Sequence, residues 1–303
     1  MSDVKLFRLR NDRVQVLEGR SVAVEKSLQS LIECHMEDFL GVRFLASEYT
    51  TGKTHKGRID SLGIDENGAP VIVEYKRALN ENVINQGLFY LDWLLDHRGE
   101  FTLLVRDRIG REEADAIEWS SARLLCIAGD FTRYDVYSVQ QIPRNIELIR
   151  YRKYGDDLLL LELINAVSGQ DVDADETTTN GTKRRYTTVD ELLEKSSQEV
   201  KDRYEMVKAF ALALGDDVQM KQLRFYYAFK RLKNFLCVEV RPQVNAVLLF
   251  LKIDPNNIEL EEGFSRDVRE IGHYGTGDLE VTLLSDEDWE KAQNLIVKSY
   301  EGN

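Results

Sequence analysis

The stretch "PVIVEYKR", residues 70–77, carries two charged side chains inside an apolar run that predicts a buried strand. Alternate residues of a strand share a face, so Glu74 and Lys76 point the same way. A lone buried carboxylate costs several kcal/mol, and two close carboxylates raise each other's pKa. A bound divalent cation would offset both costs. The alternative explanation of Glu74 and Lys76 is that they form an ion pair on an edge strand.

A second carboxylate comes from the preceding strand. Asn67-Gly68 is a strong hairpin dipeptide, which makes residues 57–64 and 71–77 an antiparallel pair. The turn brings Asp60 roughly opposite Glu74 or Tyr75. Mg²⁺ prefers carboxylate oxygens and keeps waters for a substrate phosphate, and a lysine can orient a water or offset transition-state charge.

Two predicted helices flank these strands. In the helix of residues 80–97 the apolar face is Val83, Gly87, Leu91, Leu94 and Leu95, and a polar and aromatic stripe is formed by Asn82, Gln86, Tyr90, Trp93 and His97. Such a stripe can line a nucleic-acid cleft, with amides bonding phosphates or bases and aromatic rings stacking on bases. The alternative is that this stripe is a second face of the helix that packs against the core.

The helix predicted over Ser21–Leu40 offers a third acid. Its apolar face is Val24, Leu28, Leu31, Ile32, His35 and Phe39, with Glu33 and Glu37 pointing away. Glu25 lies near the border and could turn inward toward a metal site. The alternative is that Glu25 only stabilises the helix, because an acidic side chain is favourable in the first helical turn.

The ordered set of Glu25, Asp60, Glu74-Tyr75-Lys76 and Gln86-Gly-Leu-Phe-Tyr90 resembles the PD-(D/E)XK nuclease superfamily, and the Q-x-x-x-Y element resembles its RecB-like and NucS-like branch. The longer string of residues 57–94 looks like bacterial proteins of this group that carry a C-terminal domain of unknown function. The motifs cover roughly residues 20–130, and Ile59 stands where the family motif has proline.

The resemblance implies roles for these residues. Asp60 and Glu74 would bind Mg²⁺ or Mn²⁺, and Glu25 would complete or tune the metal site. Lys76 would position the attacking water. Gln86 and Tyr90 would support the active centre and the DNA. The expected DNA contacts are Tyr90, Asn82, Trp93, Arg77 and the basic residues before Asp60, namely Lys53, Lys56 and Arg58. The alternative for these last three residues is that they simply belong to a solvent-exposed loop.

Composition limits the function classes. The chain has 303 residues, 31% charged, with a formal net charge of −13, which disfavours strong non-specific nucleic-acid binding but leaves room for a local basic groove. No apolar run reaches the length of a membrane span, and the N-terminus lacks an apolar signal core. The three cysteines form no metal knuckle or disulfide framework, which fits a cytoplasmic location.

Two domains and a linker are expected. Residues 1–165 alternate helix and strand signals, including short strands at Phe101–Arg106 and Ala122–Ala128, and predict an α/β fold. The resemblance makes this a restriction-endonuclease-like domain with a central mixed sheet. Residues 166–186 are poor in large apolar side chains and predict a linker.

Residues 187–303 predict a smaller α+β domain. A long helix over Thr188–Leu214 is followed by strand-like runs at 224–229, 235–240, 245–253 and 279–284, and a final helix starts at Ser285. Gly275–Asp278 predicts a tight turn. "YYAFKRLKNF" (226–235) is either a nucleic-acid surface or ordinary strand alternation. A homodimer or a protein partner could use this domain.

Two functions follow as expectations. The first is a Mg²⁺- or Mn²⁺-dependent nuclease that cleaves DNA, single-stranded or branched forms included, in repair, processing or defence. The second is a non-catalytic module that binds nucleic acid or protein on a nuclease-like fold. The complete set of Asp60, Glu74 and Lys76 favours the first function, and the net acidity of the chain favours the second.

Overall fold

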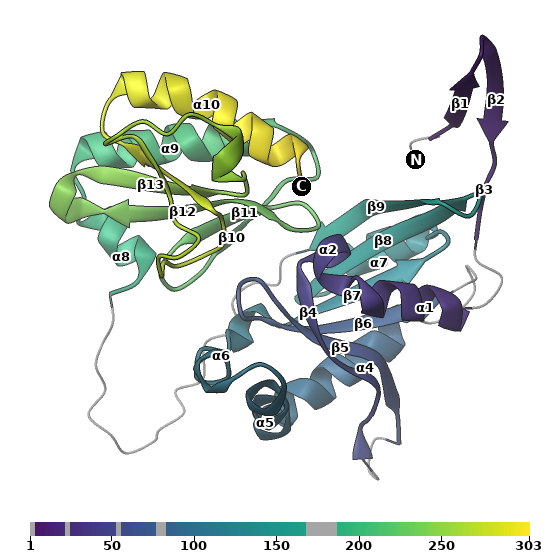
Figure 1. Cartoon of the computed structure of the whole chain (residues 1–303). Helices are drawn as coiled ribbons and strands as arrows, with labels where there is room; N and C mark the ends of the chain where they lie inside the picture. Colours follow the sequence, from purple (N-terminus) through teal and green to yellow (C-terminus); the bar gives the residue numbers. More distant parts are fainter. Residues whose placement is uncertain (1–3, 22–24, 53–55, 77–82, 168–186) are drawn as a thin grey trace. The chain divides into compact units, whose positions relative to one another are not determined.

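The computed structural model describes residues 4–21, 25–52, 56–76, 83–167 and 187–303. The chain divides into two compact units, Met1–Ala174 and Asp175–Asn303 (Figure 1). Of the predicted linker, residues 168–186 lie outside the described residues, whereas Ala166 and Val167 belong to the last strand of the first unit. The described part of the chain contains no helix suited to crossing a membrane.

The first unit is built on a mixed sheet of seven strands in the order β3-β8-β7-β6-β5-β4, with β9 also paired to β8. The β4–β5–β6 pairs are antiparallel, and the β6–β7–β8 pairs are parallel. This confirms the expected central mixed sheet. The strands are β3 Gly19–Arg20, β4 Val42–Thr50, β5 Arg58–Asp65, β6 Pro70–Lys76, β7 Arg123–Ala128, β8 Asn145–Tyr154 and β9 Leu158–Val167.

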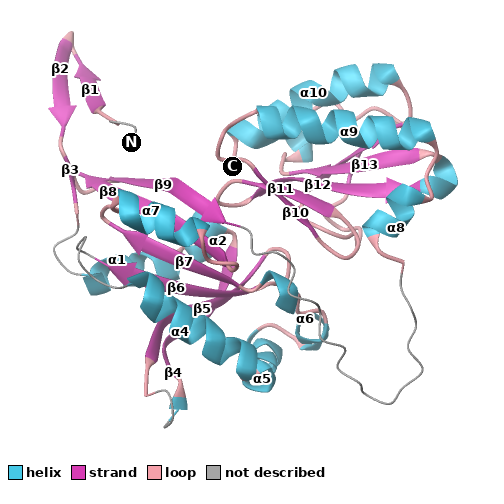
Figure 2. Cartoon of the chain, turned by 180° about the vertical axis from the view of Figure 1, so that it is seen from behind, coloured by secondary structure: helices cyan, strands magenta, loops and turns pink. Residues whose placement is uncertain are grey.

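Helices cover both faces of this sheet. The helices α1 and α2 lie on one face, and α4 and α7 lie on the other (Figures 1 and 2). On the α4 face, Leu91 and Leu94 join Ile72 and Leu124 in one buried cluster. The helices of the unit are α1 Glu25–Cys34, α2 Met36–Leu40, α4 Val83–Asp96, α5 Arg98–Arg108, α6 Arg111–Asp115, α7 Arg133–Gln140 and the 3₁₀ turn Trp119–Ser121.

The predicted β5–β6 hairpin is confirmed. Ser61 pairs with Val73 and Ile64 with Pro70. Gly68 has a φ of +78°, which glycine adopts without steric cost. The Asp65 carboxylate accepts bonds from two turn N–H groups at 2.9 Å each, so the turn is fixed by its own first residue.

In the first unit, two secondary-structure predictions differ from the structure. The expected strand at Phe101–Arg106 is part of helix α5, because Phe101 and Val105 are the buried residues and their spacing of four is helical. The single helix expected over Ser21–Leu40 is interrupted at His35, with residues 22–24 outside the described part. His35 and Leu31 are exposed, so the buried face of α1 and α2 is narrower than predicted.

Residues 4–17 form a separate two-stranded ribbon. Strand β1, Leu6–Arg10, pairs in antiparallel fashion with β2, Arg13–Leu17. The two turn residues, Asn11 and Asp12, both have positive φ angles of 47° and 60°. A primed hairpin turn requires this geometry, and it matches the right-handed twist of the strands.

The second unit is a six-stranded antiparallel sheet in the order β10-β11-β12-β13-β15-β14. Side chains of α9 and α10 pack with β12 and β13 in one buried cluster. Its elements are α8 Val189–Glu194, α9 Gln198–Ala213, β10 Gln219–Gln222, β11 Tyr227–Lys230, β12 Asn234–Arg241, β13 Ala246–Leu251, β14 Ser265–Asp267, β15 Leu279–Leu283 and α10 Asp286–Glu301, with 3₁₀ turns at Pro242–Val244 and Pro255–Asn257.

Local signals explain most of the second unit. The helix predicted over residues 188–214 is two helices, because Ser197 caps a new one by accepting from the Val200 N–H at 3.3 Å. Ser285 and Asp288 form the capping box that starts α10. The aromatic residues of the "YYAFKRLKNF" stretch are core residues rather than a nucleic-acid surface, since all four are buried: Tyr226, Tyr227, Phe229 and Phe235.

Candidate active site

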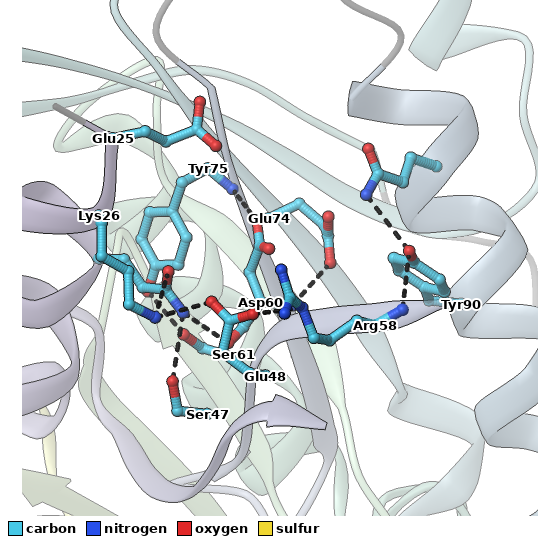
Figure 3. A network of polar contacts seen from close by, with 12 residues as sticks. Glu25, Lys26, Ser47, Glu48, Arg58, Asp60, Ser61, Glu74, Tyr75 and Tyr90 are labelled. Carbon is cyan, nitrogen blue, oxygen red and sulfur yellow. Dashed lines mark hydrogen bonds and ion pairs between the residues drawn. The ribbon is translucent and has the colours of Figure 1, made fainter. Parts of the chain in front are cut away.

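Asp60 and Glu74 meet where the β5–β6 ladder ends. The regular pairing stops at Ser61 and Val73. Beyond it, the Asp60 N–H donates to Glu74 Oε1 at 3.2 Å, and the Tyr75 N–H donates to Asp60 Oδ2 at 3.1 Å. Each carboxylate therefore bonds the backbone of the opposite strand, as Figure 3 shows, and the two acids are neighbours as predicted.

Burial makes the ionised form of Glu74 costly. Its side chain has no solvent exposure, and its Oε2 atom has no hydrogen-bond partner among the described residues. Burial, followed by the charge of Asp60, raises the pKa of Glu74 to about 9. Burial also raises the pKa of Asp60. Without a cation, the pair therefore retains a proton at neutral pH.

Lys76 adds a positive charge to the same end of β6. Its charge lowers the pKa of both Asp60 and Glu74, so it acts against the effect of burial. The lysine Nζ lies 3.8 Å from Glu25 Oε1, and its side chain is only 15% exposed. The ammonium group is thus held close to the acid pair rather than free in solvent.

Glu25 does not complete a three-acid metal site with Asp60 and Glu74. Among residues 4–21, 25–52, 56–76, 83–167 and 187–303, no three histidine, cysteine, aspartate or glutamate side chains are grouped to hold a metal ion. Glu25 instead pairs with Lys76. In this structure it can tune the charge of the site through the lysine.

Asp60 and Glu74 could hold a divalent cation such as Mg²⁺ or Mn²⁺. Backbone N–H groups donate to Glu74 Oε1 and Asp60 Oδ2. The candidate ligand atoms are therefore Asp60 Oδ1 and Glu74 Oε2, the second of which has no hydrogen-bond partner among the described residues. Mg²⁺ commonly binds one or two carboxylates and completes its shell with waters and substrate phosphate. A buried oxygen without a partner costs free energy that a bound cation recovers.

Gln86 and Tyr90 support β5 from α4. The Tyr90 hydroxyl accepts bonds from the Arg58 N–H at 3.1 Å and from Gln86 Nε2 at 3.3 Å (Figure 3). Gly57 allows this approach, since a Cβ there would lie 2.4 Å from the Tyr90 ring. Tyr90 is buried, so the structure assigns its ring to packing and its hydroxyl to holding the start of β5.

The aromatic stripe predicted on α4 is part of the core. Trp93 is 2% exposed, and its ring stacks on His97 at 4.6 Å and packs on Tyr49 at 5.8 Å. A buried indole cannot stack on a nucleic-acid base without a rearrangement of the helix. The expected DNA contact through Trp93 is therefore not supported by this geometry, and the alternative of a second core contact applies.

The other expected DNA contacts are only partly described. Lys53, Arg77 and Asn82 lie outside the described residues. Lys56 is exposed. Arg58 is exposed as well, but its guanidinium pairs with the Glu48 carboxylate (Figure 3).

Glu48 is a site residue that the sequence does not predict. It accepts a bond from Lys26 Nζ at 2.7 Å, and Lys26 is the first cause of its lowered pKa. Its charge in turn raises the pKa of Asp60. The backbone of Glu48 has a φ of +53°, and it is skipped in the β4–β5 pairing between Ser47 and Tyr49. Such strain is costly and is found where surrounding structure enforces it.

A polar network behind β5 fixes the position of Asp60. Gln29 of α1 donates to the Asp60 carbonyl at 2.8 Å and to Glu33 at 2.9 Å. Ser61 donates to Glu33 at 2.6 Å and lies 3.1 Å from the Tyr75 hydroxyl. Glu33 therefore turns toward the hairpin, contrary to its predicted outward orientation. The spacing of four between Gln29 and Glu33 was the available signal.

Comparisons with known proteins add a family match in the second unit. Residues 189–303 match the family model "Domain of unknown function (DUF5655)". The whole chain is similar to an uncharacterized protein of Haemophilus influenzae, with 25% identity over 307 residues that cover 97% of this chain and 98% of the relative. No solved structure matches the chain. The similarity to the relative therefore spans both units, and the family match is confined to the second.

Proposed function

We propose that the first unit is a Mg²⁺- or Mn²⁺-dependent nuclease of the PD-(D/E)XK type that hydrolyses phosphodiester bonds in DNA. The observation that carries the proposal is the buried Glu74 carboxylate, whose Oε2 atom has no partner among the described residues, beside Asp60. Lys76 lies on the same strand face two residues later. The order of these residues along the chain supports the same class of enzyme.

The side chains have separable roles in this proposal. Asp60 and Glu74 would hold the cation, which when bound polarises the scissile phosphate and lowers the pKa of its water. Lys76 positions the attacking water and offsets negative charge that develops on the phosphate oxygens. As the water oxygen bonds phosphorus, the bond to the leaving oxygen breaks. Gln29, Gln86 and Tyr90 keep β5 in place, so Asp60 stays aligned with Glu74.

A non-catalytic binding module is the second candidate. Two observations favour it: the described residues contain no three-acid cluster, and the chain carries a formal charge of −13. In that case the fold would recognise nucleic acid or a protein partner without cleaving it. The two candidates differ in one measurable property, which is turnover.

The test is hydrolysis of a panel of single-stranded, duplex, branched and mismatched DNA with Mg²⁺, Mn²⁺ or EDTA. We expect the wild type to cleave at least one member with metal and none with EDTA. Lys76→Ala should lower the rate by about 10²–10³, and Asp60→Ala should remove metal affinity together with activity. Lys298→Ala, an exposed lysine of α10, is the control. A wild type that binds DNA but cleaves no member would make the binding module the better account.

A further inference from the structure

The two-stranded ribbon of residues 4–17 has one strongly basic face. Residues opposite each other in an antiparallel pair share a face. The pairs Arg10–Arg13 and Arg8–Gln15 therefore project together. Residues 4–17 contain four basic side chains and one acidic one, in a chain whose formal charge is −13. The positive charge of this face is a local feature that the composition of the whole chain conceals.

The arginines of this face make no ion pair with any residue that the structure describes. Arg10 and Arg13 lie directly opposite each other, and like charges in that position destabilise a strand pair. An isolated two-stranded ribbon is only marginally stable in water. Three unpaired guanidinium groups therefore add a cost that a bound polyanion would remove.

Positive charge on the ribbon would complement that of the candidate active site. Three of the described cations near the acid pair are engaged by acids: Arg58 and Lys26 pair with Glu48, and Lys76 lies beside Glu25. Cationic contacts elsewhere on the chain would therefore add to the binding of a DNA backbone. Guanidinium groups suit this role, because their planar donors bind phosphate in a bidentate manner.

We infer that the ribbon, residues 4–17, is a nucleic-acid-binding arm whose Arg8, Arg10 and Arg13 contact the phosphate backbone of duplex DNA. The inference rests on the proposed function, since the ribbon would hold the DNA substrate of the proposed nuclease. The major groove accommodates a two-stranded β-ribbon, so the width of this element fits its target.

The opposite face of the ribbon carries Phe7, Leu9, Val14 and Val16, each more than half exposed. These side chains point away from the arginines, so DNA contact through the basic face leaves them uncovered. A second copy of the chain is the competing occupant of the ribbon. Packing of two apolar faces against each other would leave both basic faces outward, so self-association is an outcome that the experiment must distinguish from DNA binding.

The experiment measures binding of the full-length protein to a fluorescein-labelled DNA duplex by anisotropy, in EDTA and over a series of salt concentrations. The test variant is Arg8→Ala, Arg10→Ala and Arg13→Ala combined. Its control is Arg106→Ala, Arg108→Ala and Arg111→Ala, three exposed arginines of the same spacing. We expect the test variant to bind about 10–100-fold more weakly and its log Kd against log salt slope to fall by about 2–3. The control should stay within about twofold of the wild type.

A lysine version, Arg8→Lys, Arg10→Lys and Arg13→Lys, should retain most of the affinity, which separates charge from folding effects. Unchanged affinity and slope in the alanine variant would overturn the inference. A wild-type dimer that Phe7→Ser and Leu9→Ser dissociate, with DNA binding unchanged by the arginine variant, would assign the ribbon to self-association instead.

Cleavage distinguishes this inference from the proposed function. If the wild type cleaves DNA and the arginine variant binds it normally, the ribbon inference alone fails. If the wild type binds DNA through the ribbon but never cleaves it, the proposed nuclease fails and the arm remains. With both correct, the arginine variant raises KM and keeps kcat, whereas Lys76→Ala lowers kcat and keeps DNA affinity.

Discussion

At the end of the β5–β6 pairing, the carboxylates of Asp60 and Glu74 each accept a hydrogen bond from a backbone N–H group of the opposite strand. The Asp60 N–H donates to Glu74 at 3.2 Å, and the Tyr75 N–H donates to Asp60 at 3.1 Å. These bonds hold one oxygen of each carboxylate in place, and they thereby orient the second oxygen of the same carboxylate. The hairpin thus holds two carboxylates together that would otherwise repel each other.

Metal binding should release a proton from Glu74. Its pKa of about 9 means that the carboxyl is protonated below that pH, so a cation must displace the proton. We expect the Mn²⁺ association constant to rise about tenfold per pH unit between pH 6.5 and 8.5. Calorimetry in buffers of different ionisation enthalpy measures the release. Glu74→Gln should weaken binding and remove the pH dependence, and an affinity that is flat with pH in the wild type would contradict the assignment.

The stability of the metal-free protein should fall as pH rises. The folded-state pKa of Glu74 lies above its ordinary value of 4.5, so its stabilising contribution is complete below about pH 4.5 and is lost as pH approaches 9. The slope for one such group is up to about 1.4 kcal/mol per pH unit. Urea unfolding from pH 6 to 8.5 should show a shallower loss for Glu74→Gln. Equal slopes for both proteins would show that Glu74 is already ionised.

Gln29 should affect metal affinity without touching the metal. It bonds the Asp60 carbonyl at 2.8 Å and thereby positions the acid. Removal of an outer partner of a metal ligand commonly costs about 10–100-fold in affinity. We expect that loss in Mn²⁺ titrations of Gln29→Ala, with Gln198→Ala on α9 as a control. Wild-type affinity in Gln29→Ala would mean that the hairpin alone orients Asp60.

Gly87 should resist substitution by alanine despite its place in a helix. A Cβ at Gly87 would lie 2.4 Å from Leu124 Cδ1, whereas a Cβ at Gly99 of α5 meets nothing within 4 Å. Overpacking costs about 1–3 kcal/mol, and alanine in an open helix position gains up to about 1 kcal/mol over glycine. Gly87→Ala should therefore lower the free energy of unfolding and Gly99→Ala should raise it. Stabilisation by both variants would show that α4 can move away from β7.

The sequence predicts the hairpin and its acids because the signals are local. Asn67-Gly68 marks the turn, and the alternation around Glu74 sets its face. The strand prediction for Phe101–Arg106 is wrong because a short apolar run fits a strand or a buried helix equally well. Which side chains are buried decides between the strand and the helix, and burial depends on residues that are distant in sequence.

Other site residues depend on contacts that only the fold creates. Glu48 lies at the site with a backbone φ of +53°, and no local motif marks a positive φ at a glutamate. Glu33 turns inward because Ser61 offers a bond at 2.6 Å. Trp93 satisfies the pattern of a polar and aromatic stripe, but Tyr49 and His97 cover its ring. Helical spacing alone cannot distinguish a cleft from a second core contact.

The most direct test of the metal site is anomalous diffraction from crystals of the full-length protein soaked in Mn²⁺. The proposal predicts a peak about 2.0–2.2 Å from Asp60 Oδ1 and Glu74 Oε2, and the same soak of Glu74→Gln crystals should lose that peak. A wild-type map with no peak between these two carboxylates, at a Mn²⁺ concentration that binds elsewhere on the chain, would contradict the account.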